Sequence, residues 1–395
     1  MNKLFMPNVK TVLLLTTEYG DQLIGGLGRH VNDLVRTGSE YNVTFIVMTL
    51  SHTGKESYIS EDGIHIFRLL PWQEQSKGLP DYFMNLNFRF TQFILQDLHL
   101  NFDLIHVHDW FFSITAYQIK KVLRKPFITT FHSTEKERKQ FNNGKVIDKI
   151  VKHEDQLLLH SDHIIVCSHY MENILVKRMV DQYASISVIP NGIVLENMKR
   201  LLSKDEALKR FPFITKPFLL GVGRMVKEKG FQVFVDAFSM IQHKFPALKL
   251  VLAGSGPYER ELKKIVEIHG LESKVIFVGF LNEKERNTLL SKCEMLVIPS
   301  LYEPFGIVAL EGMALAKPVI AFNTGGLKEI LRDQRGIIVD QVSSVYLAER
   351  LHFYLENARE MEKIACFGNQ AMKEEYQWLT IIEKTISLYS SVVDH

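Results

Sequence analysis

Two glutamates lie eight residues apart around the start of a predicted helix. Residues Met295 to Ile298 form a short apolar run typical of a buried strand, and Pro299 ends that strand because it has no backbone N–H. Glu303 lies in the following loop, and Glu311 lies about two turns into the helical pattern. Because ligands of open α/β sheets bind at the carboxyl ends of strands, both carboxylates could bind sugar hydroxyls.

A glycine turn follows the next predicted strand, Pro318 to Phe322, at Thr324, Gly325 and Gly326. Amide N–H groups between a strand and a helix start suit an anion such as phosphate. Each of these features also has an ordinary explanation: an acid stabilised by the helix dipole, a solvated helix face, or a plain turn.

Two cations follow a predicted strand in the same half of the chain. Gly223 leads into Arg224, and Lys229 follows five residues later. A guanidinium fork and an ammonium point charge at this spacing can converge on a diphosphate. Gly254 and Gly256 form a further glycine turn after the next predicted strand.

The first half of the chain has its own glycine turn. Gly25, Gly26 and Gly28 follow the first predicted strand, Thr11 to Thr17, and precede a helix, so the backbone there can approach a phosphate closely. The turn is not G-x-G-x-x-G, and no acid ends the second strand to bind a ribose. These absences disfavour a dinucleotide-dependent oxidoreductase.

Polar residues end two further predicted strands of the first half. His106, His108 and Asp109 are of the residue types that bind metals, but no second cluster at suitable spacing is present, so we expect no metal site. His132 ends the strand Phe127 to Phe131. A lone histidine is usually structural, although a strand end is where ligands bind.

Length and composition favour a soluble protein with two domains of ordinary size. The chain has 395 residues, and its 47 Lys and Arg nearly balance its 45 Asp and Glu, which gives no reason to expect nucleic acid as a partner. Three widely spaced cysteines fit a reducing compartment. No apolar run approaches the roughly 18 residues needed to span a bilayer. The basic stretch between His132 and Asp155 is expected to be a solvated helix face, although it could also meet an anionic lipid or an anionic acceptor.

Strands and helices alternate along the whole chain, which predicts parallel α/β sheets. Residues 196–217 are charged and interrupted by prolines, and we place a hinge there. The last residues, Glu374 to Val393, have a helical pattern. We therefore expect two domains, residues 1–195 and 196–375, followed by a terminal helical segment, residues 376–395.

The motif P-S-x-x-E-P-F-G-x-x-x-L-E resembles the signature of family 4 of the retaining glycosyltransferases, which includes glycogen synthases and sucrose synthases. G-R-x-x-x-x-K-G, A-G-x-G-P, T-F-H and the first glycine turn match the same family. The resemblance implies a GT-B fold, with two Rossmann-like domains facing across a cleft and a C-terminal helix that crosses back to the first domain. It implies catalytic roles for His132, Glu303, Arg224 and Lys229, with Glu303 and His132 at the donor sugar and the cations at its diphosphate.

The resemblance also implies that the second domain binds the donor and the first binds the acceptor. Asp109 and Trp110, in H-x-H-D-W, would line the acceptor side, where Trp110 could stack on a sugar face or simply pack in the core. Leu23 stands where bacterial glycogen synthases carry a lysine, which counts against that activity. The family's donor-binding positions fall on Gly25, Gly26, Gly28, Gly223, Gly254, Gly256, Phe280, Pro304, Phe305, Gly306, Glu311, Thr324, Gly325 and Gly326, with Glu311 at the ribose and Phe280 at the base.

The chain has no D-x-D, so positive side chains must replace the divalent-metal clamp of other glycosyltransferases. The resemblance implies a retaining transferase, and we expect it to move a sugar, glucose first, from a UDP-sugar to an unidentified hydroxyl without a metal or a cofactor. A covalent mechanism needs a carboxylate nucleophile that the sequence does not identify. The alternatives are a nucleotide-sugar epimerase, a phosphorylase, or a non-catalytic sugar-binding protein. The expected location is the cytoplasm, with the inner membrane face as a further option.

Overall fold

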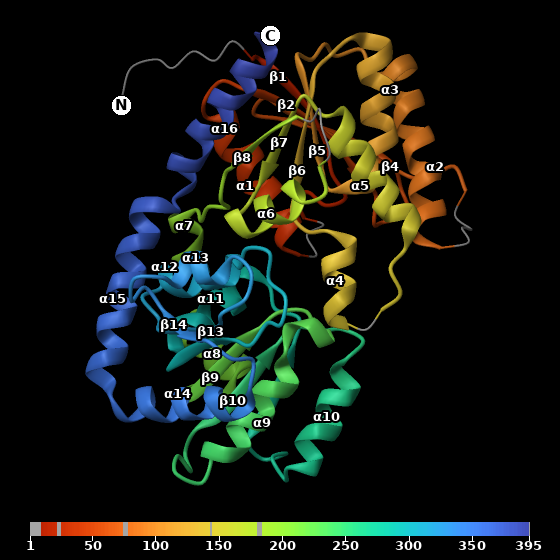
Figure 1. The fold of residues 1–395 in the computed structure, drawn as a ribbon. Helices are drawn as coiled ribbons and strands as arrows, with labels where there is room; N and C mark the ends of the chain where they lie inside the picture. The colour runs from red at the N-terminus through yellow and green to blue at the C-terminus, as the bar shows by residue number, and fades with distance from the viewer. Residues whose placement is uncertain (1–8, 22–24, 74–77, 143, 180–183, 395) are drawn as a thin grey trace. The chain divides into compact units, whose positions relative to one another are not determined.

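The computed structural model describes residues 9–21, 25–73, 78–142, 144–179 and 184–394, so Leu23 lies outside the described residues. The chain divides into two compact units. Unit 1 holds the described residues up to Lys136, Lys145–Asn191 and the last helix from Trp378, and unit 2 holds Glu137–Gly144 and Gly192–Gln377. Each unit contains one predominantly parallel sheet covered by helices (Figure 1).

The unit 1 sheet has the strand order β3-β4-β2-β1-β5-β6-β7-β8. Its strands are β1 (Thr11–Leu15), β2 (Thr44–Leu50), β3 (Ser57–Glu61), β4 (Ile64–Leu69), β5 (Leu104–His108), β6 (Phe127–Phe131), β7 (His163–Val166) and β8 (Ser185–Val188). All neighbours pair in parallel except β3, which runs antiparallel to β4. The sequence did not predict β3, because all of its residues are exposed and it therefore lacks the apolar signal of a buried strand.

Helices cover both faces of this sheet. Figure 1 shows α2, α3 and α5 grouped on one side, with α1 and α16 on the other. A side chain at Gly38 of α1 would meet Phe45 of the sheet and Ile382 of α16, so this glycine permits the close packing of three layers. The helices described in unit 1 are α1 (Gly26–Ser39), α2 (Leu79–Gln92), the π-turn η1 (Phe93–Asp97), η2 (Trp110–Phe112), α3 (Ser113–Leu123), α5 (Asp148–His160), α6 (His169–Val176) and α16 (Trp378–Val393). A further helix, α4 (Glu135–Asn142), begins in unit 1 and ends in unit 2.

A buried polar network joins the last helix to the unit 1 sheet. The hydroxyl of Tyr389 on α16 lies 2.7 Å from Nδ1 of His106, and Nε2 of His106 lies 2.7 Å from Oγ1 of Thr130. Tyr389 is 0 % exposed and His106 is 1 % exposed. Because buried polar groups are costly unless paired, each member of this network depends on the others.

The unit 2 sheet is entirely parallel, with the strand order β11-β10-β9-β12-β13-β14. Its strands are β9 (Phe218–Val222), β10 (Lys249–Ala253), β11 (Val275–Gly279), β12 (Met295–Ile298), β13 (Val319–Phe322) and β14 (Ile337–Val339). The described helices are α7 (Leu195–Met198), α8 (Lys204–Arg210), η3 (Pro212–Thr215), η4 (Lys227–Lys229), α9 (Phe231–Ile241), α10 (Glu259–Ile268), α11 (Glu283–Lys292), α12 (Ile307–Ala314), α13 (Leu327–Leu331), α14 (Ser344–Glu356) and α15 (Ala358–Glu375).

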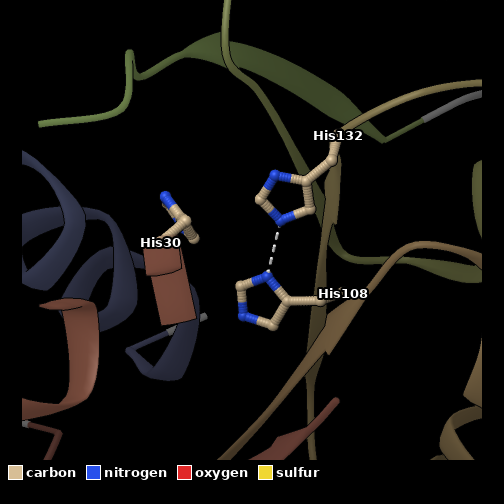
Figure 2. A group of neighbouring side chains, drawn as sticks. All are labelled: His30, His108 and His132. Carbon is tan, nitrogen blue, oxygen red and sulfur yellow. Dashed lines mark hydrogen bonds between the residues drawn. The ribbon is translucent and has the colours of Figure 1, made fainter. Parts of the chain in front are cut away.

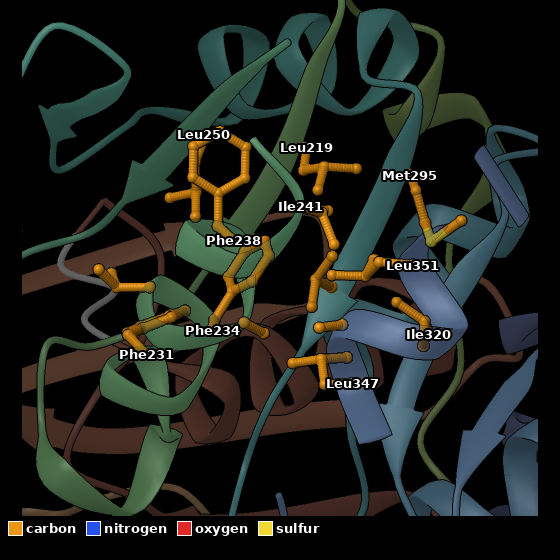
Figure 3. Packing of buried hydrophobic residues seen from close by; sticks show 14 of the residues in the cluster. Leu219, Phe231, Phe234, Phe238, Ile241, Leu250, Met295, Ile320, Leu347 and Leu351 are labelled. Carbon is orange, nitrogen blue, oxygen red and sulfur yellow. The ribbon is translucent and has the colours of Figure 1, made fainter. Parts of the chain in front are cut away.

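The core of unit 2 lies between its sheet and two of these helices. Phe234 and Phe238 on α9 and Leu347 and Leu351 on α14 are almost completely buried in one apolar cluster (Figure 3). They pack against strand residues such as Leu250. Continuous apolar runs in these strands follow from burial on both faces of a parallel sheet.

Two chain segments differ from the predicted pattern. The proposed hinge stretch, residues 196–217, folds into short helices, of which α8 begins with a capping box between Ser203 and Glu206. The predicted terminal helix is interrupted after Glu375, and Gln377 forms a β-bridge with Ile193 before α16 begins. No helix among the described residues is both long and apolar enough to cross a membrane.

We predict that Tyr389→Phe destabilises unit 1, because Nδ1 of His106 then stays buried without its partner. We expect the free energy of unfolding to fall by about 1–3 kcal/mol. Each kcal/mol should lower the melting temperature by about 2–4 °C. Differential scanning fluorimetry measures the shift. Tyr41→Phe is the control, since its hydroxyl makes only an exposed 3.5 Å contact with Glu383 of the same helix. Equal melting temperatures for the two variants would contradict the role of the buried network.

Candidate active site

The candidate site in unit 2 lies where the strand order reverses. The chain moves from β9 outward through β10 and β11, and then returns to pair β12 with the other side of β9. The loops that follow β9 and β12 therefore diverge at one point of the carboxyl edge, which is where open α/β sheets bind ligands. One loop bears Arg224 and Lys229, and the other bears Glu303.

The structure brings Lys229 and Glu303 together. Nζ of Lys229 lies 2.5 Å from Oε2 of Glu303, and Ser300 donates its hydroxyl to the same oxygen at 3.1 Å. Both side chains of the ion pair are mostly buried, with 27 % of Lys229 and 14 % of Glu303 exposed. The carboxylate thus fixes the position of the ammonium group at the strand ends.

Arg224 is held less firmly than Lys229. Its guanidinium lies 3.7 Å from the carboxylate of Glu228, and 61 % of its side chain is exposed. Glu228 is buried, but at this distance and with the guanidinium largely in solvent the pair contributes little free energy. Arg224 can therefore turn toward an incoming anion without losing a strong interaction.

Two predicted donor-binding glycines have a packing role. A Cβ atom at Gly254 would overlap the carbonyl oxygen of Gly223, and one at Gly325 would overlap the carbonyl oxygen of Glu303. Both glycines also have positive φ angles, of 133° and 54°. These positions therefore require glycine so that neighbouring loops can pack backbone against backbone.

The amide of Gly326 makes a backbone contact between two loops. Its N–H donates to the carbonyl oxygen of Glu303 at 3.0 Å and so ties the turn after β13 to the loop after β12. Thr324 supports the same junction, because its hydroxyl donates to the carbonyl oxygen of Ser300 at 2.9 Å.

Glu311 lies on α12 and is almost completely buried, with 2 % of its side chain exposed. Its carboxylate lies 3.1 Å from the guanidinium of Arg286 on α11. Ribose binding at Glu311 therefore requires the side chains around it to move.

The other predicted donor positions lie nearby in sequence or at strand ends. Pro304 is half-buried, Phe305 is buried, and Gly306 precedes α12. Gly256 lies against Met225, and Phe280 after β11 is 61 % exposed.

Unit 1 also reverses its strand order, between β1 and β5. Asp109 follows β5 and His132 follows β6 at the same edge. Oδ1 of Asp109 accepts the backbone N–H of His132 at 2.7 Å and that of Ser133 at 3.4 Å. Asp109 is 6 % exposed, and these hydrogen bonds hold the backbone at His132; its expected place on the acceptor side stays a prediction.

Trp110 packs in the core. It is 4 % exposed, meets Phe83 edge-on with ring centroids 5.2 Å apart, and stacks on His153. This burial favours the packing alternative over stacking on a sugar face.

The first glycine turn lies beside a carboxylate. The N–H of Gly25 donates to Oε2 of Glu18 at 2.9 Å, just before α1 begins at Gly26. A negative group at a helix N-terminus is favourable. Glu18 therefore supplies a negative group next to the start of α1, and Gly28 lies buried within the first turn of that helix.

Sequence reasoning missed a cluster of histidines at the edge of unit 1. His30 on α1, His108 at the end of β5 and His132 each offer a ring nitrogen, and these nitrogens lie within 4.8 Å of one another (Figure 2). Nδ1 of His108 lies 3.0 Å from Nε2 of His132. Only the sheet topology brings these three residues together, since no local spacing connects them.

Burial keeps these imidazoles neutral. Desolvation lowers the pKa of His30 to about 4, and desolvation together with the proximity of His30 lowers the pKa of His106 to about 3. Burial, reinforced by neighbouring histidines, also holds the pKa of His108 and His132 well below the usual 6.5. A sugar or phosphate near His132 therefore meets a neutral ring.

We predict that acid destabilises unit 1. The folded pKa values of these histidines are depressed, so below about pH 6.5 the unfolded chain binds more protons and stability falls as the pH falls. Each histidine contributes about 1.4 kcal/mol per pH unit at most. Melting temperatures measured from pH 7.5 to 5.5 test this, and His30→Asn should flatten the dependence. A melting temperature that stays constant over this range would exclude the mechanism.

The chain is similar to known proteins along most of its length. The family described as Glycosyltransferase Family 4 matches residues 24–197, and Glycosyl transferases group 1 matches residues 203–372. An uncharacterised glycosyltransferase of Bacillus subtilis is 29 % identical over 97 % of this chain and 98 % of its own length.

Solved structures share the fold. The sucrose-phosphate synthase of Thermosynechococcus elongatus superposes with a TM-score of 0.85 at 22 % identity, covering 97 % of this chain and 99 % of that chain. The HepE protein of Anabaena, solved with UDP and glucose, gives a TM-score of 0.75 at 18 % identity, covering 97 % of this chain and 100 % of that chain. The predicted GT-B fold, with two Rossmann-like parallel sheets, is confirmed. Since the two family matches together take in both halves of the chain, this protein belongs to the glycosyltransferases of family 4 and group 1.

Proposed function

We propose that this protein transfers a sugar, glucose first, from a UDP-sugar to a hydroxyl acceptor with retention of the anomeric configuration. The observation that carries the proposal is the paired Lys229 and Glu303, with Arg224 on the preceding loop, at the switch point of the unit 2 sheet. This set offers two cations to a diphosphate and one carboxylate to a sugar hydroxyl.

The cations act on the leaving group. As the bond between the sugar and the phosphate breaks, negative charge develops on the departing diphosphate, and preorganised positive groups stabilise it. Lys229 is preorganised by Glu303, whose carboxylate also accepts the hydroxyl of Ser300, whereas Arg224 turns in from solvent. We propose that these side chains replace a divalent cation and that the reaction needs no cofactor.

For His132 we propose a contact with the donor sugar. Asp109 holds its backbone, and burial keeps its ring neutral, so it can exchange hydrogen bonds without adding a charge beside an electron-poor sugar carbon. Retention would follow from attack on the face that the phosphate leaves, with a phosphate oxygen taking the proton of the acceptor hydroxyl. The new glycosidic bond then replaces the sugar–phosphate bond, and nucleoside diphosphate is released.

The choice of UDP and glucose rests on likeness to other proteins. The HepE protein of Anabaena was solved with UDP and glucose, and it shares the fold of this chain. The exposed ring of Phe280 after β11 is suited to lie against a nucleotide base. We propose the cytoplasm as the compartment, because the three cysteines are thiols and not disulfides.

A donor-hydrolysis panel tests the donor without an acceptor. We expect slow release of UDP from UDP-glucose and less release from ADP-glucose, GDP-mannose or UDP-N-acetylglucosamine. Proton NMR should show the freed glucose first as the α anomer. Preferential hydrolysis of another donor would correct the sugar or base, initial β-glucose would exclude retention, and formation of an epimer or sugar phosphate would favour an epimerase or a phosphorylase.

The ion pair gives a second prediction. Lys229→Ala should slow UDP release by about 100-fold, since one charge that stabilises the departing group is lost. Lys227→Ala is the matched control, because Lys227 lies on the same turn, η4, two residues earlier. Rates with saturating UDP-glucose measure the effect, and a similar loss in both variants would contradict a specific role for Lys229.

Glu303→Gln separates two roles of the carboxylate. If Glu303 acts only by holding Lys229, the double variant with Lys229→Ala should be no slower than Lys229→Ala alone. If Glu303 also binds the sugar, as we propose, the double variant should be slower by about a further tenfold.

A further inference from the structure

Three imidazoles from three separate elements converge at the edge of the unit 1 sheet. His30 comes from α1, His108 from the end of β5, and His132 from the loop after β6, and Figure 2 shows ring nitrogens of His108 and His132 facing each other with His30 beside them. One nitrogen from each lies within 4.8 Å of the others. The pair from the two strands is closer, with Nδ1 of His108 3.0 Å from Nε2 of His132.

We propose that these three histidines form a binding site for a divalent transition-metal ion of the Zn²⁺ class. Imidazole nitrogens suit Zn²⁺, Co²⁺, Ni²⁺ and Cu²⁺, whereas Mg²⁺ and Ca²⁺ need oxygen ligands that this group lacks. Three histidines leave a fourth position for water or another ligand, which is the composition of open zinc sites.

The surroundings of one ring nitrogen agree with metal binding. Nδ1 of His30 is buried and has no hydrogen-bond partner among the described residues. A bound ion would give such a nitrogen a partner that the protein itself does not supply.

The geometry needs a modest adjustment. Zinc–nitrogen bonds of about 2.0–2.1 Å in a tetrahedron place ligand nitrogens about 3.4 Å apart. The pair from His108 and His132 is slightly closer than this, and the third nitrogen is farther away. A rotation of the His30 side chain toward the other two rings would bring it into range.

The surroundings set the affinity. Binding replaces the hydrogen bond between His108 and His132, and Nε2 of His108 has no partner among the described residues to orient the ring. A missing outer partner typically weakens metal binding by about 10–100-fold. We therefore expect micromolar, reversible binding and not a resident ion.

The ion would act as an inhibitor. His132 is the residue that we propose contacts the donor sugar, so an ion bound to its Nε2 would compete with the donor. This consequence rests on the proposed function, whereas the binding site itself does not. The histidine site differs in its chemistry from the proposed diphosphate-binding residues. Arg224 and Lys229 are cations, so they bind an anion and do not bind a metal ion.

Titration with Co²⁺ tests the site without any sugar donor. The full chain should bind one Co²⁺ with the visible absorption of a four-coordinate ion, and Zn²⁺ should displace it. His30→Asn and His108→Asn should each weaken binding at least tenfold. His269→Asn is the control, since His269 lies beside Asp236 at 2.8 Å on the surface of unit 2 and is the kind of pair that binds metals adventitiously.

Anomalous diffraction from Zn²⁺-soaked crystals of the unaltered protein gives a readout that does not depend on the folding of variants. A zinc peak between the three rings supports the proposal. No binding below about 100 µM, or binding lost only in His269→Asn, would overturn it. Bound Zn²⁺ should reduce UDP release in proportion to occupancy, and undiminished release at full occupancy would overturn the competition at His132 alone.

Discussion

Close approach of backbone to backbone at the carboxyl edge of the unit 2 sheet is the constraint on which the candidate site depends. The turn after β13 lies against the backbone of Glu303, and the turn after β10 lies against that of Gly223, at distances that only glycine permits. These contacts leave the loops little freedom. The side chains of Lys229 and Glu303 therefore meet from stems that the fold holds in place, and charges held in advance stabilise a transition state better than charges that must first be ordered.

The strand ends of unit 1 carry neutral side chains where those of unit 2 carry paired charges. The unit 1 strand ends carry imidazoles whose charge is suppressed by burial, and the carboxylate of Asp109 next to His132 accepts backbone N–H groups. The neutrality of this edge comes at a cost in stability at low pH, because the folded chain resists protonation there. The network of Tyr389, His106 and Thr130 continues the same pattern into the core and ties the last helix to it.

Local patterns predicted the strands and the loops at their ends, but they did not predict which side chains meet. Met295–Ile298 was predicted residue for residue, because a buried parallel strand is a continuous apolar run. Lys229 and Glu303 are 74 residues apart, so their ion pair follows only from strand order. The sequence also did not identify His30 as part of the histidine cluster, because a lone histidine in a helix is usually structural. Trp110 and Glu311 are both buried, which their motifs did not predict. A motif gives a residue's place along a strand or helix, but not its burial.

The ion pair also connects the two roles proposed for the unit 2 site. Before a donor binds, Lys229 neutralises Glu303 and Arg224 lies near Glu228, so two positive charges are balanced by two negative charges. Under the proposed function, a diphosphate draws both cations toward itself, and Glu303 then loses the partner that neutralises it. A buried carboxylate without its cation needs new hydrogen bonds, and sugar hydroxyls can supply them. Binding of the diphosphate would thus favour binding of the sugar, because it releases Glu303 from Lys229. The site would therefore bind an intact nucleotide-sugar better than either fragment.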